Sequence, residues 1–126
     1  MTQPIETRRF VRVSFHAVAT LIDNDLRLPV EILELSLKGA TLELPEANIE
    51  FLSPHAALHL IIGDAGMEIS MEIVLRNRDQ KRIGVEWSSI DIDSLEHLRR
   101  LIELNSGDPE EVRTEMTSLS GQNPAR

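Results

Sequence analysis

The chain lacks several residue types on which common functions depend. It has no cysteine and no tyrosine, and its aromatic side chains are Trp87 and three phenylalanines among 126 residues. The absence of cysteine excludes disulfide frameworks, thiolate metal sites and thiol catalysis. So few aromatic side chains leave no stacking platform for single-stranded nucleic acid. At this length a single domain can bury a sufficient core, and that core is expected to be aliphatic.

Long apolar runs are absent as well. The longest, such as LHLII at residues 58–62, fall far short of the ~20 residues that span a bilayer. The N-terminal stretch MTQPIETRRF lacks the apolar core of a signal peptide. We therefore expect a soluble, cytoplasmic protein that makes no membrane contact.

Positive charge is scarce overall. Thirteen lysines and arginines stand against 21 aspartates and glutamates, which gives a formal net charge of −8. Long-range attraction to DNA or RNA is therefore disfavoured. Any site for an anion must be local.

Apolar residues recur at every second position from about Val13 to Ser88, which is the period of β-strands. Strands are expected at residues 13–22, 28–44, 57–75 and 81–90, with a Gly-Asp-Ala-Gly turn dividing the third stretch, a loop at 45–55 and a charged turn at 76–80. In the second stretch the alternation slips at Ile32 and Leu33, which predicts a bulge, or a bend near Gly39. Short strands joined by hairpin turns favour a small antiparallel barrel or sandwich.

The apolar period changes to about 3.6 residues after the last strand, which predicts a helix over residues 93–107. Asp93 and Glu96 have capping-box spacing at its start. Asp108 followed by Pro109 predicts a second helix, expected to be short because its apolar stripe is thin. The predicted organisation is a mobile arm at residues 1–12, a barrel at 13–90, a helical extension at 91–120 and a disordered tail at 121–126.

Two motifs suggest where chemistry takes place. The first is ETRRFVRVSF, which places Arg8, Arg9 and Arg12 within five positions. Guanidinium groups bind phosphates and the acceptor edge of guanine through paired hydrogen bonds. Charged residues before a first strand are also commonly just solvated, so this motif alone leaves both interpretations open.

The second motif is ELSLKG, with Glu34 and Ser36 on one face of a strand and Gly39 at a bend. The carboxylate can accept hydrogen bonds from the N1 and N2 donors of guanine, the hydroxyl can reach a phosphate or backbone group, and the glycine permits close backbone approach. Alone, the motif is equally typical of an ordinary strand end with a bulge.

Together the two motifs resemble the PilZ family, whose pattern is an RxxxR arm followed by a D/N-x-S-x-x-G strand. RRFVR supplies Arg8 and Arg12, with Arg9 between them, and Ser36 and Gly39 are in register. RIGVEWSSIDIDS is similar to the family's closing strand, so the resemblance covers about residues 6 to 104. It implies a mainly β fold, a six-stranded antiparallel barrel with C-terminal α-helices, whose ligand is cyclic di-GMP.

The resemblance also implies the roles of the site residues. Arg8 and Arg12 would bind phosphate and guanine, Arg9 would add charge or stack on a base, and Ser36 and Gly39 would line the surface beneath the ligand. The sequence departs from the pattern at Glu34, where the family usually has Asp or Asn. The extra methylene puts the guanine contact in doubt, and its loss would cost ~1–3 kcal/mol.

Arg76 and Arg78 lie where the family often supplies a further guanine contact, although a charged hairpin end explains them equally well. A zinc site at His55 and His59 is disfavoured because no third ligand is near in sequence. Ser36 lacks a nucleophile-elbow pattern, and GDAG at 63–66 is not followed by the Lys of a phosphate loop. We expect no enzymatic activity, no metal and no cofactor.

Three functional hypotheses remain. The first is a cyclic di-GMP receptor whose arm becomes ordered on the ligand and which signals in trans to an effector protein, in motility or chemotaxis, since 126 residues leave no room for an output domain. The second is a ligand-blind adaptor in which Glu34 has disabled guanine recognition. The third, a nucleic-acid-binding barrel, is disfavoured by the net charge of −8.

Overall fold

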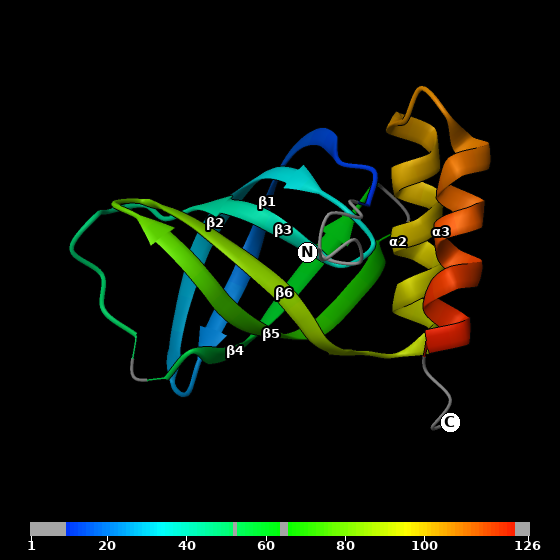
Figure 1. Ribbon diagram of the computed structural model, residues 1–126. Coiled ribbons are helices and arrows are strands. Elements are labelled where there is room, and N and C mark those ends of the chain that lie inside the picture. The colour runs from blue at the N-terminus through cyan, green and yellow to red at the C-terminus, as the bar shows by residue number, and fades with distance from the viewer. Residues whose placement is uncertain (1–9, 52, 64–65, 123–126) are drawn as a thin grey trace, which may run out of the picture.

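The computed structural model describes residues 10–51, 53–63 and 66–122 (Figure 1). Arg8 and Arg9 of the predicted arm lie outside these ranges. The strands are β1 (Val13–Asp23), β2 (Leu26–Leu35), β3 (Gly39–Glu43), β4 (His55–Ile62), β5 (Met67–Asp79) and β6 (Arg82–Ile90), and they are followed by helices α2 (Ile92–Asn105) and α3 (Pro109–Gln122).

The six strands close into an antiparallel barrel in the order β1-β2-β3-β6-β5-β4, which confirms the predicted fold class. The stretch 28–44 divides into β2 and β3 at the bend before Gly39, and the register of this pair also shifts between Ile32 and Glu34, as the broken alternation predicts. The charged turn predicted at 76–80 is wrong in extent. Residues 76–79 continue β5, and the chain reverses at Gln80, whose φ of 59° is the left-handed conformation that a tight hairpin requires.

The core fills the barrel with aliphatic side chains and continues under one end of it. Inward positions alternate with outward ones along each strand, as at Ile83 and Val85 of β6, which are both buried. Helix α2 covers the end of the barrel and packs against β5, and α3 lies beside α2 (Figure 1). Leu98 and Ile102 of α2 and Val112 of α3 are fully buried and join the same apolar cluster.

The helix boundaries differ from the sequence prediction in two ways. The N-cap of α2 is Asp91 rather than Asp93, because Asp91 has extended backbone and its Oδ2 accepts a 3.0 Å hydrogen bond from the N–H of Ser94. Hydrogen bonds from Ser94 lower the pKa of the Asp91 carboxyl below its ordinary value of 3.8, the side-chain bond more than the backbone bond.

The second difference concerns α3, which has 14 residues and reaches Gln122, so it is not short. Its predicted cap is confirmed, since Oδ1 of Asp108 accepts a hydrogen bond from the N–H of Glu111. The thin apolar stripe led to an underestimate of the length of the helix, because packing of Val112 against the core, rather than helix propensity, stabilises it. Among the described residues, no helix is both long and apolar enough to cross a membrane.

Candidate functional site

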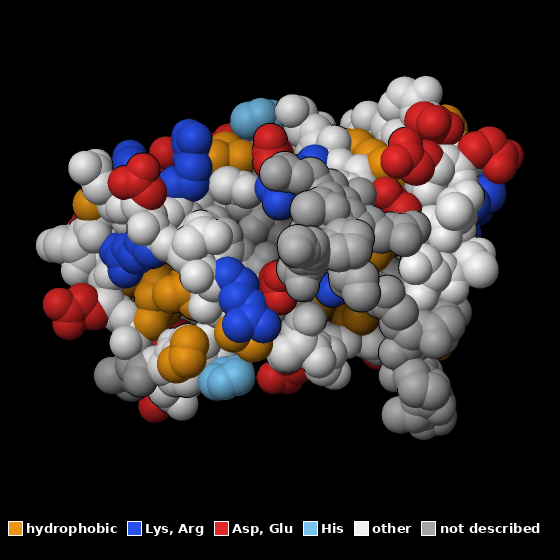
Figure 2. Space-filling view, viewed as in Figure 1, with side chains coloured by type: hydrophobic (Ala, Val, Ile, Leu, Met, Phe, Trp, Pro, Cys, Tyr) orange, Lys and Arg blue, Asp and Glu red, His pale blue; other side chains and the backbone are white. Residues whose placement is uncertain are grey.

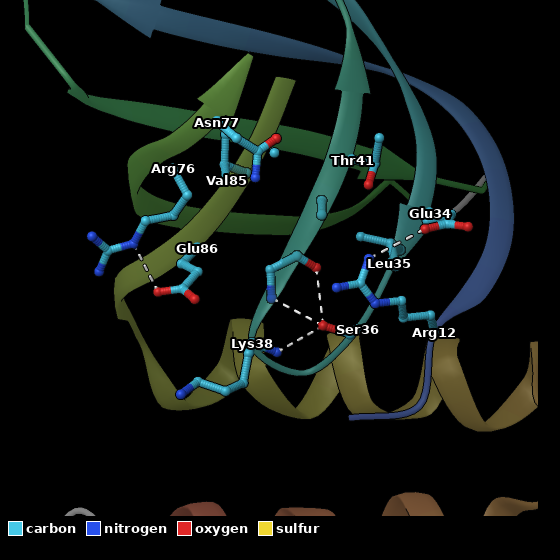
Figure 3. A pocket seen from close by; sticks show the side chains of 13 residues that line it. Arg12, Glu34, Leu35, Ser36, Lys38, Thr41, Arg76, Asn77, Val85 and Glu86 are labelled. Atoms are coloured by element: carbon cyan, nitrogen blue, oxygen red, sulfur yellow. Dashed lines mark hydrogen bonds and ion pairs between the residues drawn. The ribbon is translucent and has the colours of Figure 1, made fainter. Parts of the chain in front are cut away.

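A hollow of about 230 Å³ lies on the outer surface of the barrel. It is formed by the end of β2, the turn into β3, and the facing parts of β6 and β5, with one residue of the N-terminal arm at its margin (Figure 3). The lining residues are Arg12, Glu34, Leu35, Ser36, Lys38, Gly39, Ala40, Thr41, Arg76, Asn77, Gly84, Val85 and Glu86.

Strand register places one row of residues side by side across the hollow. Glu34 of β2 pairs with Thr41 of β3, Thr41 pairs with Gly84 of β6, and Gly84 pairs with Asn77 of β5. Gly84 has no side chain in this row, and the side-chain amide of Asn77 fills the space beside it: an added Cβ would lie 2.7 Å from Oδ1 of Asn77. The missing side chain of Gly84 therefore makes room for the side chain of Asn77, which also lines the hollow.

Two β-bulges lie at the two ends of the row, each beside a charged residue. The register between β2 and β3 shifts between Ile32 and Glu34, and the register between β5 and β6 shifts between Leu75 and Asn77. Arg76 is the extra residue of the second bulge. Bulges re-aim side chains and recur beside functional sites. In this chain they bring Glu34 and Arg76 to the two sides of the hollow.

The turn between β2 and β3 is built by the hydroxyl of Ser36. Its Oγ accepts hydrogen bonds from the N–H groups of Lys38 and Gly39, each at 3.1 Å, and lies 3.3 Å from the carbonyl oxygen of Gly39 (Figure 3). Ser36 is buried, and its own N–H donates to that same carbonyl at 2.9 Å. The hydroxyl therefore satisfies the turn's backbone groups.

At Gly39 the backbone of β3 lies close against the backbone of β6. A Cβ built there would fall on the carbonyl oxygen of Val85, far inside van der Waals contact, and would lie 3.1 Å from Cα of Glu86. Both neighbours are backbone atoms and cannot rotate away. Only glycine fits this position, because the backbone of β6 lies too close to leave room for a side chain.

Opposite charges are paired at both margins of the hollow. Arg12 approaches from one side, with its Nη1 3.5 Å from Oε1 of Glu34, and Arg76 approaches from the other, with its Nε 3.0 Å from Oε1 of Glu86 (Figure 3). All four side chains are about half exposed. Exposed pairs of this kind contribute about 0–1 kcal/mol. A more highly charged anion can therefore displace either carboxylate at small cost.

With Lys38, the hollow has three cationic side chains and two carboxylates, so its local charge is positive although the chain carries −8. Figure 2 shows acidic side chains gathered on the helical end of the molecule, while acidic and basic side chains are mixed over the barrel. A local anion site in an acidic protein, as the sequence predicts, is compatible with this distribution.

The structure brings together five of the residues predicted from the sequence: Arg12, Glu34, Ser36, Gly39 and Arg76. Arg78 does not line the hollow. Its guanidinium donates to the carbonyl oxygens of Ala47 at 2.6 Å and Gln80 at 2.9 Å, and it lies over the ring of Phe51, so it holds the loop between β3 and β4. Arg8 and Arg9 lie outside the described residues.

The sequence analysis missed Lys38, Thr41, Asn77, Gly84 and Glu86 among the lining residues. The position of Glu86 could have been inferred from the sequence. Glu86 lies between Val85 and Trp87, which share the inner face of the predicted strand, so the alternation places Glu86 on the outer face. Its distance from Arg76 depends on the bulge in β5, which the uninterrupted polar run at 76–80 does not reveal.

The arrangement suits an anion that also carries hydrogen-bond donors. Guanidinium and ammonium groups can bind phosphate oxygens, while the carboxylate of Glu34 can accept from a base. Within the described ranges, no three His, Asp or Glu side chains cluster closely enough to hold a metal ion. His59, one of the two histidines considered for zinc, lies 3.7 Å from Glu68 on the neighbouring strand.

Two comparisons with known proteins give matches for this chain. The PilZ domain matches the chain over residues 6–104. The fold is similar to that of the Bacillus subtilis inhibitor of motility, MotI/DgrA, with a TM-score of 0.64 and 18% sequence identity. The similarity covers 87% of this chain and 52% of the other, so this chain spans about half the length of that neighbour.

Proposed function

Because this chain belongs to the PilZ domain family, we propose that it is a receptor that binds cyclic di-GMP at the hollow on β2, β3, β5 and β6. The PilZ domain is a binding domain rather than a catalytic one, and the proposal assigns no enzymatic step to this chain. The observation that carries the proposal is that Arg12, Arg76 and Lys38 line one hollow together with Glu34, on a chain of net charge −8.

Cyclic di-GMP matches both kinds of group in the hollow. Its two phosphodiesters are anions for the guanidinium groups, and its two guanines offer the N1 and N2 donors that the carboxylate of Glu34 can accept. The volume of about 230 Å³ is below the roughly 300–1,000 Å³ typical of pockets for drug-sized ligands. A cyclic dinucleotide would therefore lie partly outside the hollow, where Arg8 and Arg9 remain candidate contacts on the strength of the sequence motif.

The signal would pass to another protein by contact. Ligand bound between the barrel and Arg12 changes the surface that this margin presents, and a partner that recognises the changed surface would respond. We propose an effector protein in motility or chemotaxis, since the structurally similar Bacillus subtilis protein is an inhibitor of motility. The cytoplasm is the compartment in which this messenger would be met.

A ligand-blind adaptor is the second candidate, and one observation favours it. Arg12 and Arg76 each already have a carboxylate neighbour, Glu34 and Glu86, and Glu34 is longer than the usual Asp or Asn of the family. If the glutamates hold the arginines more firmly than exposed pairs ordinarily do, the hollow would not take an anion.

A calorimetric titration with cyclic di-GMP tests the proposal. Binding to the wild-type chain is expected, and it should weaken as salt is raised because the contacts are ionic. Arg12→Ala should lower the affinity about 10- to 100-fold, the value of one hydrogen-bonded charge contact. Arg27→Ala is the control, because it removes the same charge from an exposed position at the start of β2 that does not line the hollow.

Two outcomes would reject the receptor assignment. One is the absence of heat and of amide shifts around the hollow at high ligand concentration, which would favour the adaptor. The other is equal affinity of the Arg12 and Arg27 variants, which would place any binding elsewhere. Replacing cyclic di-GMP with cyclic di-AMP should weaken binding, because adenine lacks the N1–H and N2 donors that Glu34 is proposed to accept.

A further inference from the structure

The start of the described chain is held between the barrel and helix α3. Phe10 and Val11 are half-buried and pack against the core cluster, and Nζ of Lys38 lies 5.7 Å from the ring centroid of Phe10. The N–H of Val11 donates a 2.7 Å hydrogen bond to Oε2 of Glu115, which is 104 residues away in sequence. In Figure 1 this first segment runs along the helical end of the barrel. Residues 10 and 11 of the predicted mobile arm are thus anchored.

Glu115 is unusual among the acidic residues of this helix. It is only 3% exposed and lies on the face of α3 that carries Val112 and Met116. Burial of a carboxylate is costly unless it is hydrogen-bonded, and a bond from a backbone N–H to a carboxylate is stronger than one between neutral groups. Glu111, one turn earlier on the same helix, is exposed. The buried position of Glu115 therefore fits a specific role at the chain start.

The bonded amide immediately precedes a residue of the hollow. Val11 is joined by one peptide unit to Arg12, whose guanidinium lies 3.5 Å from Glu34. Fixing the Val11 N–H restricts where the main chain of Arg12 begins, and therefore which atoms its side chain can reach. An Arg12 whose main chain was not anchored in this way would lose more conformational entropy on binding an anion than the anchored residue does.

Helix α3 begins at Pro109, beyond the last residue of the PilZ match at 104. The element that holds Val11 is thus outside the family domain. We propose that Glu115 is a positioning residue for Arg12, and that through it α3 presets the arm for cyclic di-GMP. This inference rests on the proposed function for its ligand, but the anchoring itself is a property of the free protein.

Thermodynamic linkage gives the proposal a second consequence. If docking of α3 on the arm raises the affinity for the ligand by some factor, then the ligand must favour docking of α3 by the same factor. Binding at the hollow would thereby be reported on a helix at the far end of the chain. A partner that recognises α3 would sense the ligand without touching it.

Full-length variants of Glu115 test the inference. Glu115→Ala removes the acceptor, Glu115→Gln keeps an acceptor but loses the charge, and Glu111→Ala removes the same charge from an exposed position of α3. Glu115→Ala should lower the affinity for cyclic di-GMP roughly three- to tenfold, Glu115→Gln should lower it less, and Glu111→Ala should stay within about twofold of wild type. Hydrogen exchange at the Val11 amide should be fastest in Glu115→Ala, with the ligand absent.

Glu115→Gln also serves if the alanine variant does not fold, because it preserves the shape of the buried side chain. Equal affinity and equal Val11 exchange in the Glu115 and Glu111 variants would overturn the proposal. So would a loss of affinity without any change at Val11, which would indicate general destabilisation. If the wild type fails to bind the ligand, the proposed function fails, and unchanged Val11 exchange in Glu115→Ala would then separately refute the anchor.

Discussion

Replacement of Gly39 by alanine is expected to destabilise the barrel strongly. The new Cβ would fall on the carbonyl oxygen of Val85 and would lie 3.1 Å from Cα of Glu86. Because these are backbone atoms of the paired strand, rotation of a side chain cannot relieve the overlap. The strands β3 and β6 would have to separate at the pairs Gly39↔Glu86 and Ala40↔Val85.

The magnitude follows from what separation would disrupt. Overpacking of a well-packed region costs about 1–3 kcal/mol. Each backbone hydrogen bond lost from the β3–β6 ladder adds about 0.5–1.5 kcal/mol, and the 2.8 Å bond from the N–H of Trp87 to the carbonyl of Lys38 lies in the same place. Two such bonds bring the total to about 2–6 kcal/mol. This is a large part of the 5–15 kcal/mol typical of a domain.

Urea unfolding followed by circular dichroism measures the effect, with Gly107→Ala as the control. Gly107 has no heavy atom within 4 Å of a built Cβ, and its φ is not in the left-handed range. Its replacement should change the free energy of unfolding by less than about 1 kcal/mol. If Gly39→Ala were as stable as Gly107→Ala, with the same m-value, the close approach of β3 and β6 would be wrong.

Three further predictions concern the site and the helical extension. Ser36→Ala should destabilise the chain by about 1–3 kcal/mol relative to the exposed Ser88→Ala in the same urea assay, because two turn N–H groups lose their acceptor; equal midpoints would contradict this role. Glu86→Gln should tighten cyclic di-GMP binding about two- to tenfold by calorimetry, because phosphate no longer competes with a carboxylate for Arg76. The control Glu72→Gln removes the same charge from β5 and should not tighten binding. Weaker binding by Glu86→Gln would instead identify Glu86 as a ligand contact. The pKa of the Asp91 carboxyl is lowered in the folded state, so its stabilisation is present above 3.8 and lost as the pH falls through the folded pKa; the thermal midpoint of Asp91→Ala should lie below that of wild type at neutral pH and converge with it in acid, and a gap independent of pH would refute the assignment.

The strands and one bulge could be predicted from the sequence because each inner residue alternates with an outer one. The slip at Ile32 and Leu33 breaks that alternation and appears in the structure as a register shift. The bulge at Arg76 could not be predicted, because residues 76–80 are all polar and a shift among polar residues leaves no trace in the pattern. The ion pair between Arg76 and Glu86 depends on this register shift, so it could not be predicted either.

The helical extension shows the same limit at another level. Asp91 and Asp93 are both suitable N-caps by residue type, and only the backbone direction after β6 selects Asp91. The bond from Val11 to Glu115 joins residues 104 positions apart. No local period or spacing specifies such a contact, since it depends on how α3 packs on α2. The arm motif was visible in the sequence, but its anchor was not.

The turn at Ser36 and Gly39 has a consequence for how related chains should be compared. Both residues are required to build the junction of β2 and β3, whatever the hollow contains. Natural selection for a folded barrel alone would retain them, even in a related chain that does not bind cyclic di-GMP. We therefore expect the S-x-x-G half of the motif to persist through such losses, while positions 8, 12 and 34 diverge first. In a comparison of related chains, the absence of the arginines, rather than of the glycine, would indicate that a chain does not bind the ligand.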